Sequence, residues 1–163
     1  MDCLAFSITY RLASETRKKV LNLFSHKNPN PDGISKLKII SLVINESLRL
    51  YPLMIGIIRK VDKEVGLGHL ILLPNLHFYI SNLALHHDPQ IWGEVVHKFK
   101  SDRFSQGIAK TANDYNGASF FPFGIGPQTC VGMNLALTQV KIALSMILQR
   151  DGSSLPSTSS PPF

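Results

Sequence analysis

A glycine-rich loop leads straight into an apolar helix in the last third of this chain, and a cysteine stands at the junction. Gly124, Gly126 and Gly132 let the backbone pass close to a flat or bulky group, because glycine has no side chain. The helix is predicted from about Val131 to Gln149, with apolar residues recurring on one face. Its amino terminus offers unpaired N–H groups and the positive end of the helix dipole, which stabilise a thiolate at Cys130. The segment therefore suits a cysteine that serves as a metal ligand.

The same residues allow other interpretations. A glycine-rich turn can simply cap a helix beside a buried free cysteine. A dinucleotide or phosphate loop fits less well, because Gly124-x-Gly126 lacks a third glycine and follows Phe-Pro-Phe rather than a clear strand. A thiol enzyme with Cys130 as nucleophile would need a paired histidine and an orienting acid, and the sequence nominates neither.

An acid and a base share one face of a predicted helix earlier in the chain. Apolar residues recur at helical spacing from about Lys36 to Leu50, until Pro52 ends the pattern. Glu46 and Arg49 are three residues apart within it and therefore lie on one face. Most pairs of this kind are solvated surface ion pairs that contribute little. A second arginine, Arg103, follows in the segment Phe-Lys-Ser-Asp-Arg-Phe.

Taken together and in this order, these segments resemble the cytochrome P450 family. The loop is similar to the family pattern F-x-x-G-x-R-x-C-x-G, which is met by Phe123, Gly126, Cys130 and Gly132. Gln128 departs from it, because the family has arginine or histidine there. The helix resembles the family's E-x-x-R helix, and the Arg103 segment resembles its P-E-R-F segment. The resemblance covers residues from about 17 to 149 and is greatest to the plant P450 group that includes secologanin synthase.

The resemblance implies a haem cofactor with Cys130 as its axial thiolate, a ligand that favours cleavage of the O–O bond. It implies that Glu46, Arg49 and Arg103 form a buried structural charge network ahead of the cysteine. Arg59 falls where the family places a propionate-binding arginine, although a surface strand residue is the other interpretation. The implied haem contacts are Cys130, Phe123, Gly126, Gln128, Gly132 and Arg59. The implied substrate-facing residues are Leu53, Met54, Ile55, Gly56 and Ile57.

The same resemblance implies a haem-thiolate monooxygenase that inserts one oxygen atom of O2 into a small apolar substrate. Its electrons would come from NADPH–cytochrome P450 reductase, at the cytoplasmic face of the endoplasmic reticulum. The family's central proton-delivery helix, its upstream propionate ligands and its membrane anchor have no counterpart in this sequence, so no catalytic residue is expected here. The alternative is a truncated, non-catalytic P450 remnant with weak or no haem binding.

We expect a mainly α fold with a small β-sheet (α+β), as the incomplete carboxy-terminal part of the P450 fold, over residues 1–149. A helix from about Ser14 to Phe24 precedes a loop at HKNPNPDG, and several short strands follow between Met54 and Ser81. A long irregular segment then runs from about His86 to Pro122. The Ser/Pro-rich tail, residues 150–163, has no apolar periodicity and is expected to be disordered.

Composition excludes several other classes of protein. Seventeen lysines and arginines against eleven acidic residues give a net charge of +6, but the basic residues are scattered without interleaved aromatics, which disfavours nucleic-acid binding. Cys3 and Cys130 cannot build a disulfide framework and indicate a reducing compartment. There is no signal peptide and no apolar run of membrane-spanning length, so we expect this chain, without an anchor, in the cytosol. The histidines show no zinc-ligand spacing, and Trp92, Phe120 and Phe121 are assigned to the core.

Overall fold

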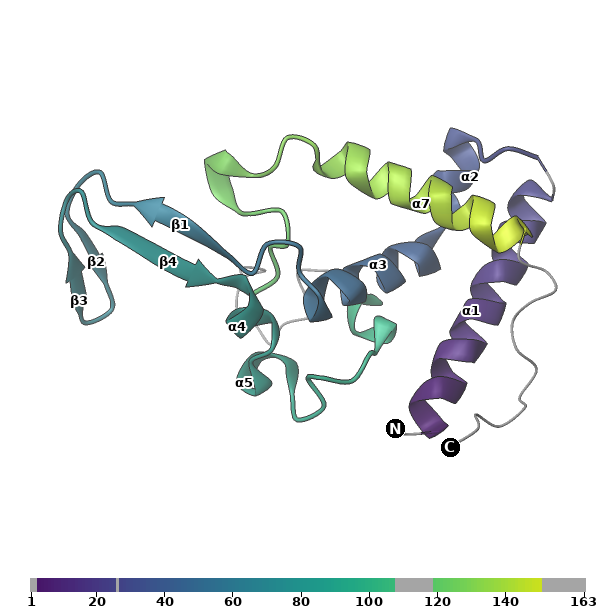
Figure 1. Ribbon diagram of the computed structural model, residues 1–163, viewed down its shortest axis with the longest axis horizontal. Helices are drawn as coiled ribbons and strands as arrows, with labels where there is room; N and C mark the ends of the chain where they lie inside the picture. The colour runs from purple at the N-terminus through teal and green to yellow at the C-terminus, as the bar shows by residue number, and fades with distance from the viewer. Residues whose placement is uncertain (1–2, 26, 108–118, 151–163) are drawn as a thin grey trace, which may run out of the picture. The chain divides into compact units, whose positions relative to one another are not determined.

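The computed structural model describes residues 3–25, 27–107 and 119–150, which form helices and two small sheets (Figure 1). The helices are α1 (Cys3–Phe24), α2 (Pro31–Lys36), α3 (Lys38–Leu50), α4 (Asn82–His86), α5 (Pro89–Trp92) and α7 (Met133–Arg150), with 3-10 turns η1 (Ser101–Phe104) and η2 (Gly126–Gln128). The strands are β1 (Gly56–Lys60), β2 (Val65–Leu67), β3 (Leu70–Leu72) and β4 (His77–Ser81). The predicted α+β class is confirmed. The described residues within 1–41 and 132–163 form one compact unit, and those within 42–131 form another.

The first unit is helical. Helix α1 begins at Cys3, well before the predicted Ser14, and contacts α7, where the Arg17 side chain donates to the carbonyl of Leu148 at 3.0 Å. The Gln149 side chain also donates to the carbonyl of Lys27, at 3.2 Å. The buried apolar residues of this unit are Val20, Phe24, Ile34, Leu37 and Ile40. These buried residues come from α1, from α2 and its C-cap Leu37, and from the first turn of α3.

Helix α2 is a correction to the sequence prediction, which assigned its first residues to a loop. Asn30 is its N-cap, and its side-chain oxygen accepts the amide of Gly33 at 2.8 Å. Pro31 occupies the first helical position, where a missing N–H costs nothing. The Asn-Pro pair that reads as a helix breaker is here a helix start. The following helix, α3, accordingly begins at Lys38 rather than Lys36.

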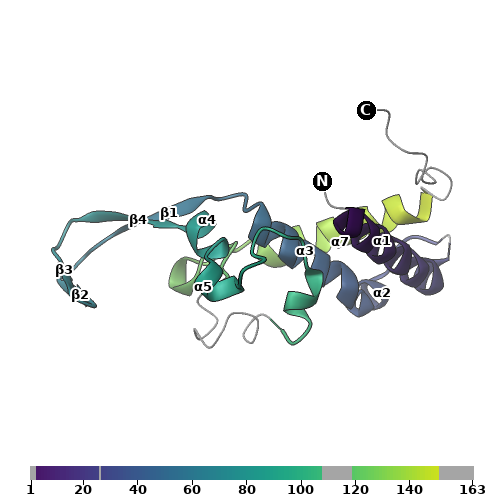
Figure 2. The same ribbon diagram turned by 90° about the horizontal axis from the view of Figure 1, so that it is seen from below.

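The second unit contains two separate two-stranded antiparallel sheets where one small sheet was predicted. Strand β1 pairs with β4, with Gly56 opposite Ser81 and Lys60 opposite His77. Strands β2 and β3 form a hairpin that continues beyond that pair, as both views show (Figures 1 and 2). Gly68, in its turn, has φ +59°, a conformation that glycine adopts without strain. Helix α4 follows β4 directly and contacts β1.

The long segment after α4 carries the core of the second unit. Its buried apolar cluster is Ile91, Trp92, Val96, Phe104 and Phe120. The assignment of Trp92, Phe120 and Phe121 to the core is confirmed, since all three are less than 10% exposed. Part of the predicted irregular segment, residues 108–118, and nearly all of the predicted tail, residues 151–163, lie outside the described residues. None of the helices in the described ranges is both long and apolar enough to span a bilayer.

Candidate functional site

The loop that carries Cys130 is closed by its own backbone. The amide of Cys130 donates to the carbonyl of Phe123 at 2.9 Å, and the amide of Gly124 donates to the carbonyl of Phe121 at 2.9 Å. Gly124 and Gly126 have φ values of +81° and +79°, which other residues rarely adopt, so these two glycines are needed for the path of the chain. The loop therefore fixes the backbone on either side of the cysteine without using its sulfur.

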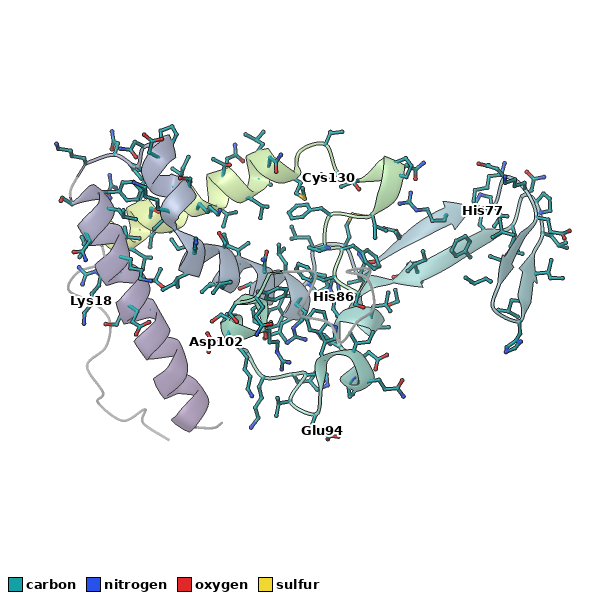
Figure 3. The ribbon with its side chains drawn as sticks, turned by 180° about the vertical axis from the view of Figure 1, so that it is seen from behind. Lys18, His77, His86, Glu94, Asp102 and Cys130 are labelled. Carbon is teal, nitrogen blue, oxygen red and sulfur yellow. The ribbon has the colours of Figure 1, made fainter. Side chains whose placement is uncertain are left out.

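Cys130 itself is a free and exposed thiol (Figure 3). The sulfur is accordingly available to a ligand from solvent. Helix α7 begins at Met133, two residues later than predicted, and the Ala136 amide donates to the carbonyl of Gly132 at 2.9 Å. The contribution of the helix dipole to the Cys130 thiolate stays a prediction.

Arg59 lies beside this loop. Its Nη2 donates to the carbonyl of Ile125 at 3.5 Å, which links strand β1 to the turn before Gly126. The contact is long and exposed, so it leaves most of the guanidinium donors to other partners. Of the other predicted haem contacts, Gln128 is exposed, and Phe123 and Gly132 are partly buried. The structure thus gathers Arg59, Phe123, Gly126, Gln128 and Cys130 around one loop.

The five predicted substrate-facing residues divide into two groups. Leu53, Met54 and Ile55 are 87%, 53% and 61% exposed, which is unusual for aliphatic side chains in a row. Gly56 and Ile57 belong to strand β1 and are partly buried. A side chain at Gly56 would collide with Tyr79, because an added Cβ would lie 2.2 Å from the tyrosine ring. The first group is therefore an apolar surface, whereas Gly56 makes room for Tyr79, its diagonal neighbour on β4.

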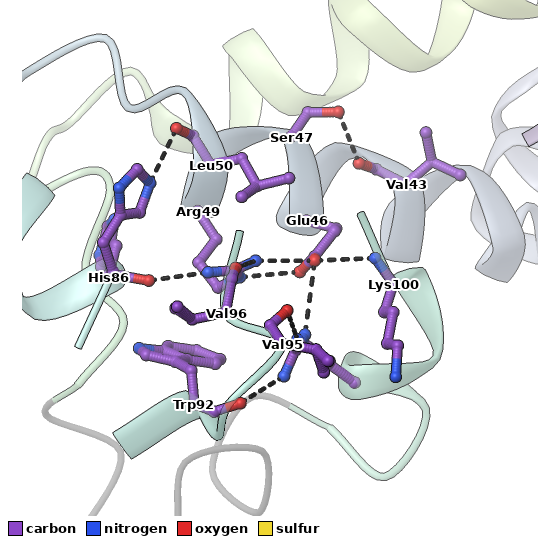
Figure 4. Close-up of polar contacts among 12 residues, drawn as sticks. Val43, Glu46, Ser47, Arg49, Leu50, His86, Trp92, Val95, Val96 and Lys100 are labelled. Atoms are coloured by element: carbon purple, nitrogen blue, oxygen red, sulfur yellow. Dashed lines mark hydrogen bonds and ion pairs between the residues drawn. The ribbon is translucent and has the colours of Figure 1, made fainter. Parts of the chain in front are cut away.

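Glu46 and Arg49 form a fully buried ion pair on α3 (Figure 4). The guanidinium donates twice to the carboxylate, from Nε to Oε2 and from Nη2 to Oε1, each at 2.9 Å. Its remaining donors reach the carbonyls of His86 at 2.8 Å and Val96 at 2.7 Å. Trp92 adds its ring face, 5.2 Å from the guanidinium carbon. Each nitrogen of this buried cation thus donates to at least one acceptor, as burial of a charge requires.

Arg103, in η1, completes the charge network. Its Nε lies 3.5 Å from Glu46 Oε1, an ion pair without hydrogen-bond geometry, and its Nη2 donates to the carbonyl of Val95 at 2.7 Å. Glu46 Oε1 also accepts the amide of Lys100 at 2.9 Å. Burial and the nearby Arg49 lower the pKa of Arg103, while Glu46 raises it. Two arginines and one carboxylate therefore hold α3 against the segment from Trp92 to Phe104.

His86 is a buried residue to which the sequence assigned no site role. It ends α4 and is 0% exposed, and its ring lies 5.3 Å from that of Phe120 and 6.0 Å from that of Phe121, between ring centres. Burial, Arg49 and His87 lower its pKa to about 4. The rings it meets are more than thirty residues away along the chain, so no local pattern predicts this environment.

Comparisons with known proteins identify one family. The family model described as "Cytochrome P450" matches residues 9–162. Cytochrome P450 CYP749A22 of Panax ginseng is 54% identical over 135 residues, which are 83% of this chain and 26% of that protein. The 11-oxo-beta-amyrin 30-oxidase of Medicago truncatula is 40% identical over 136 residues (83% and 26%). The 7-deoxyloganic acid hydroxylase of Catharanthus roseus is 39% identical over 137 residues (84% and 26%). The chain spans about a quarter of the length of these relatives.

Proposed function

This chain belongs to the cytochrome P450 family, and we propose that Cys130 is the axial thiolate ligand of a haem iron. The observation that carries the proposal is the exposed, free thiol on a loop whose backbone hydrogen bonds are already closed. A bound haem would supply the capacity to activate O2, with the thiolate favouring O–O cleavage.

The residues around the loop fit such a group. Gly124 and Gly126 keep side chains off the loop, and no described atom lies within 4 Å of a Cβ built at Gly126, so a flat macrocycle can approach. Arg59 offers free donors to an anionic propionate next to the loop. Leu53, Met54 and Ile55 present an apolar surface suited to the hydrocarbon part of a cofactor or substrate. Phe123, Gln128 and Gly132 would complete the contacts from the loop itself.

The whole protein from which such a chain comes is proposed to be a monooxygenase acting on a small apolar substrate. Relatives named 11-oxo-beta-amyrin 30-oxidase and 7-deoxyloganic acid hydroxylase support oxidation of a carbon skeleton as the reaction class. NADPH–cytochrome P450 reductase is the proposed electron donor, and the cytoplasmic face of the endoplasmic reticulum the proposed location. In this chain, Glu46, Arg49 and Arg103 have a structural role, because all three side chains are occupied by one another and by backbone carbonyls.

A second candidate is a non-catalytic P450 remnant that binds haem weakly. It is favoured by the uncharged Gln128 at a position where the family carries a cation, and by the exposure of Leu53 and Val131. The first feature weakens binding of the anionic propionates, and the second weakens binding of the apolar macrocycle. The two candidates differ in affinity for haem rather than in the identity of the ligand.

The thiolate assignment is tested by spectroscopy. The purified chain, reconstituted with haem, reduced and exposed to carbon monoxide, should show the red-shifted Soret band of thiolate ligation. Cys130→Ala should abolish that band, whereas the matched variant Cys3→Ala should keep it, because these are the two cysteines in the chain. A band that survives Cys130→Ala would refute the assignment.

A further inference from the structure

His86 connects two parts of the second unit through different atoms. Its backbone carbonyl accepts Arg49 Nη1 at 2.8 Å, and its ring lies against Phe120 and Phe121. The carbonyl of Phe121 accepts the amide of Gly124, at the start of the loop that ends in Cys130. A continuous set of contacts therefore runs from the buried charge network, through one imidazole, to the cysteine loop.

The imidazole sits where a positive charge is disfavoured. Neither ring nitrogen has a hydrogen-bond partner in the described part of the chain, and the side chain is fully buried. The charged or titratable groups that act on it are Arg49 from α3 and its neighbour His87, both of which oppose a second positive charge. Phe120 and Phe121 contribute aromatic rings, and α5 contributes the uncharged Trp92 to the same core as Phe120. Among the described residues no carboxylate acts on this ring, so none of them would compensate a proton on His86.

We propose that His86 is a positioning residue, whose uncharged imidazole holds Phe120 and Phe121 and thereby keeps the Cys130 loop closed. The loop opens when the imidazole takes up a proton, since the charged ring leaves its buried position for water. The importance of that closure for a haem rests on the proposed function, but the closure itself concerns this chain alone.

The direction of the pH dependence follows from linkage. The buried ring has a pKa of about 4, against 6.5 for an exposed histidine, so the open state binds more protons between these values. Closure is therefore fully favoured above pH 6.5 and is lost as the pH falls toward 4. Between pH 7.5 and pH 5 the opening equilibrium should rise roughly 30-fold.

Amide hydrogen exchange of the full 163-residue chain without haem measures this opening. The amides of Gly124 and Cys130 are hydrogen bonded inside the loop, so their protection factors, corrected for intrinsic exchange, should fall roughly 30-fold from pH 7.5 to pH 5. The amides of Ile57 and Ile80, which face each other in the pairing of β1 with β4, should keep their protection. Uniform loss at all four amides would overturn the proposal, because it would mean acid unfolding of the whole unit.

Substitution separates the imidazole from other acid-sensitive groups. His86→Leu keeps the volume and removes the unpaired nitrogens, so the loop should stay protected at pH 7.5 and become independent of pH. His77→Leu, on the exposed face of β4, should leave the 30-fold dependence intact. An unchanged pH dependence in His86→Leu would overturn the proposal. If His86→Leu does not fold, His86→Gln gives the same comparison, because glutamine is uncharged at every pH used.

The result is independent of the haem assignment. A chain that binds no haem but shows the predicted exchange contradicts the proposed function and leaves the role of His86 standing. A chain with the thiolate spectrum but a pH-independent loop contradicts the role of His86 alone.

Discussion

Gln128 is the residue at which this loop departs most from its family pattern. The side chain is exposed in the turn η2, two residues before Cys130, and it can donate a hydrogen bond but carries no charge. Haem propionates are anionic and prefer charge-assisted donors, which are roughly twice as strong as neutral ones. The effect of this substitution should therefore appear in haem affinity rather than in the fold of the loop, whose hydrogen bonds are made by backbone groups.

Gln128→Arg should tighten haem binding by several-fold, or about 1 kcal/mol, because it replaces a neutral donor by a charged one. Haem titration followed by absorbance measures the change. Gln139→Arg, on the exposed surface of α7, adds the same charge elsewhere and serves as the control. Equal gains in the two variants would show a general charge effect and contradict a propionate contact at Gln128.

At the scale of the elements, the periodicity of apolar residues and the positions of glycine and proline predicted most helices and strands. They did not predict which residues of different elements contact one another. The apolar stripe ending at Pro52 predicted α3 almost in full, because helical spacing is a local property. Helix α2 was missed, since whether Asn30-Pro31 ends or starts a helix depends on a cap hydrogen bond three residues away. The division into two sheets, and the burial of His86 against Phe120 and Phe121, depend on pairings distant in sequence. The cysteine loop and the charge network were predicted through a family resemblance, because spacing alone does not bring Arg103 to Glu46.

The charge network joins elements, and its removal should be costly. Arg49→Ala leaves the Glu46 carboxylate buried without its strongest partner and frees the carbonyls of His86 and Val96. Loss of one partner of a buried pair typically costs 3–5 kcal/mol, so the free energy of unfolding of the second unit should fall by about that amount. Trp92 is the only tryptophan in the chain and lies in this network, so the denaturant midpoint of its fluorescence reports on the unit.

Two variants calibrate this measurement. Arg49→Lys keeps the charge but not the planar fork of donors and should fall between the parent and Arg49→Ala. Lys63→Ala, in an exposed position before β2, should change the free energy of unfolding by less than about 0.5 kcal/mol. An Arg49→Ala chain as stable as the Lys63→Ala chain would contradict a structural role for the network.

At the scale of the whole molecule, several large apolar side chains have no cover among the described residues. Leu53, Ile55 and Val131 are 87%, 61% and fully exposed, and the first two belong to the apolar surface proposed for cofactor or substrate. The chain also spans only about a quarter of the length of its relatives. A haem held by one loop would keep its other face in water. It would lose roughly 25 cal/mol of binding free energy for each Å2 of apolar surface left uncovered.

The 163-residue chain alone should therefore bind haem with a dissociation constant in the micromolar range or weaker, about −8 kcal/mol or less favourable. The proposed ligands Cys130 and Arg59 would supply specific contacts, but they flank one loop and would not enclose the macrocycle. Absorbance titration of the parent and of Cys130→Ala measures the haem affinity of the chain and the contribution of Cys130 to it. The variant should bind haem more weakly still. Nanomolar affinity that depends on Cys130 would show that this chain closes a complete haem site, and the non-catalytic remnant would then be the wrong candidate. Nanomolar affinity that survives Cys130→Ala would instead place the haem elsewhere, on exposed apolar surface such as Leu53 to Ile55.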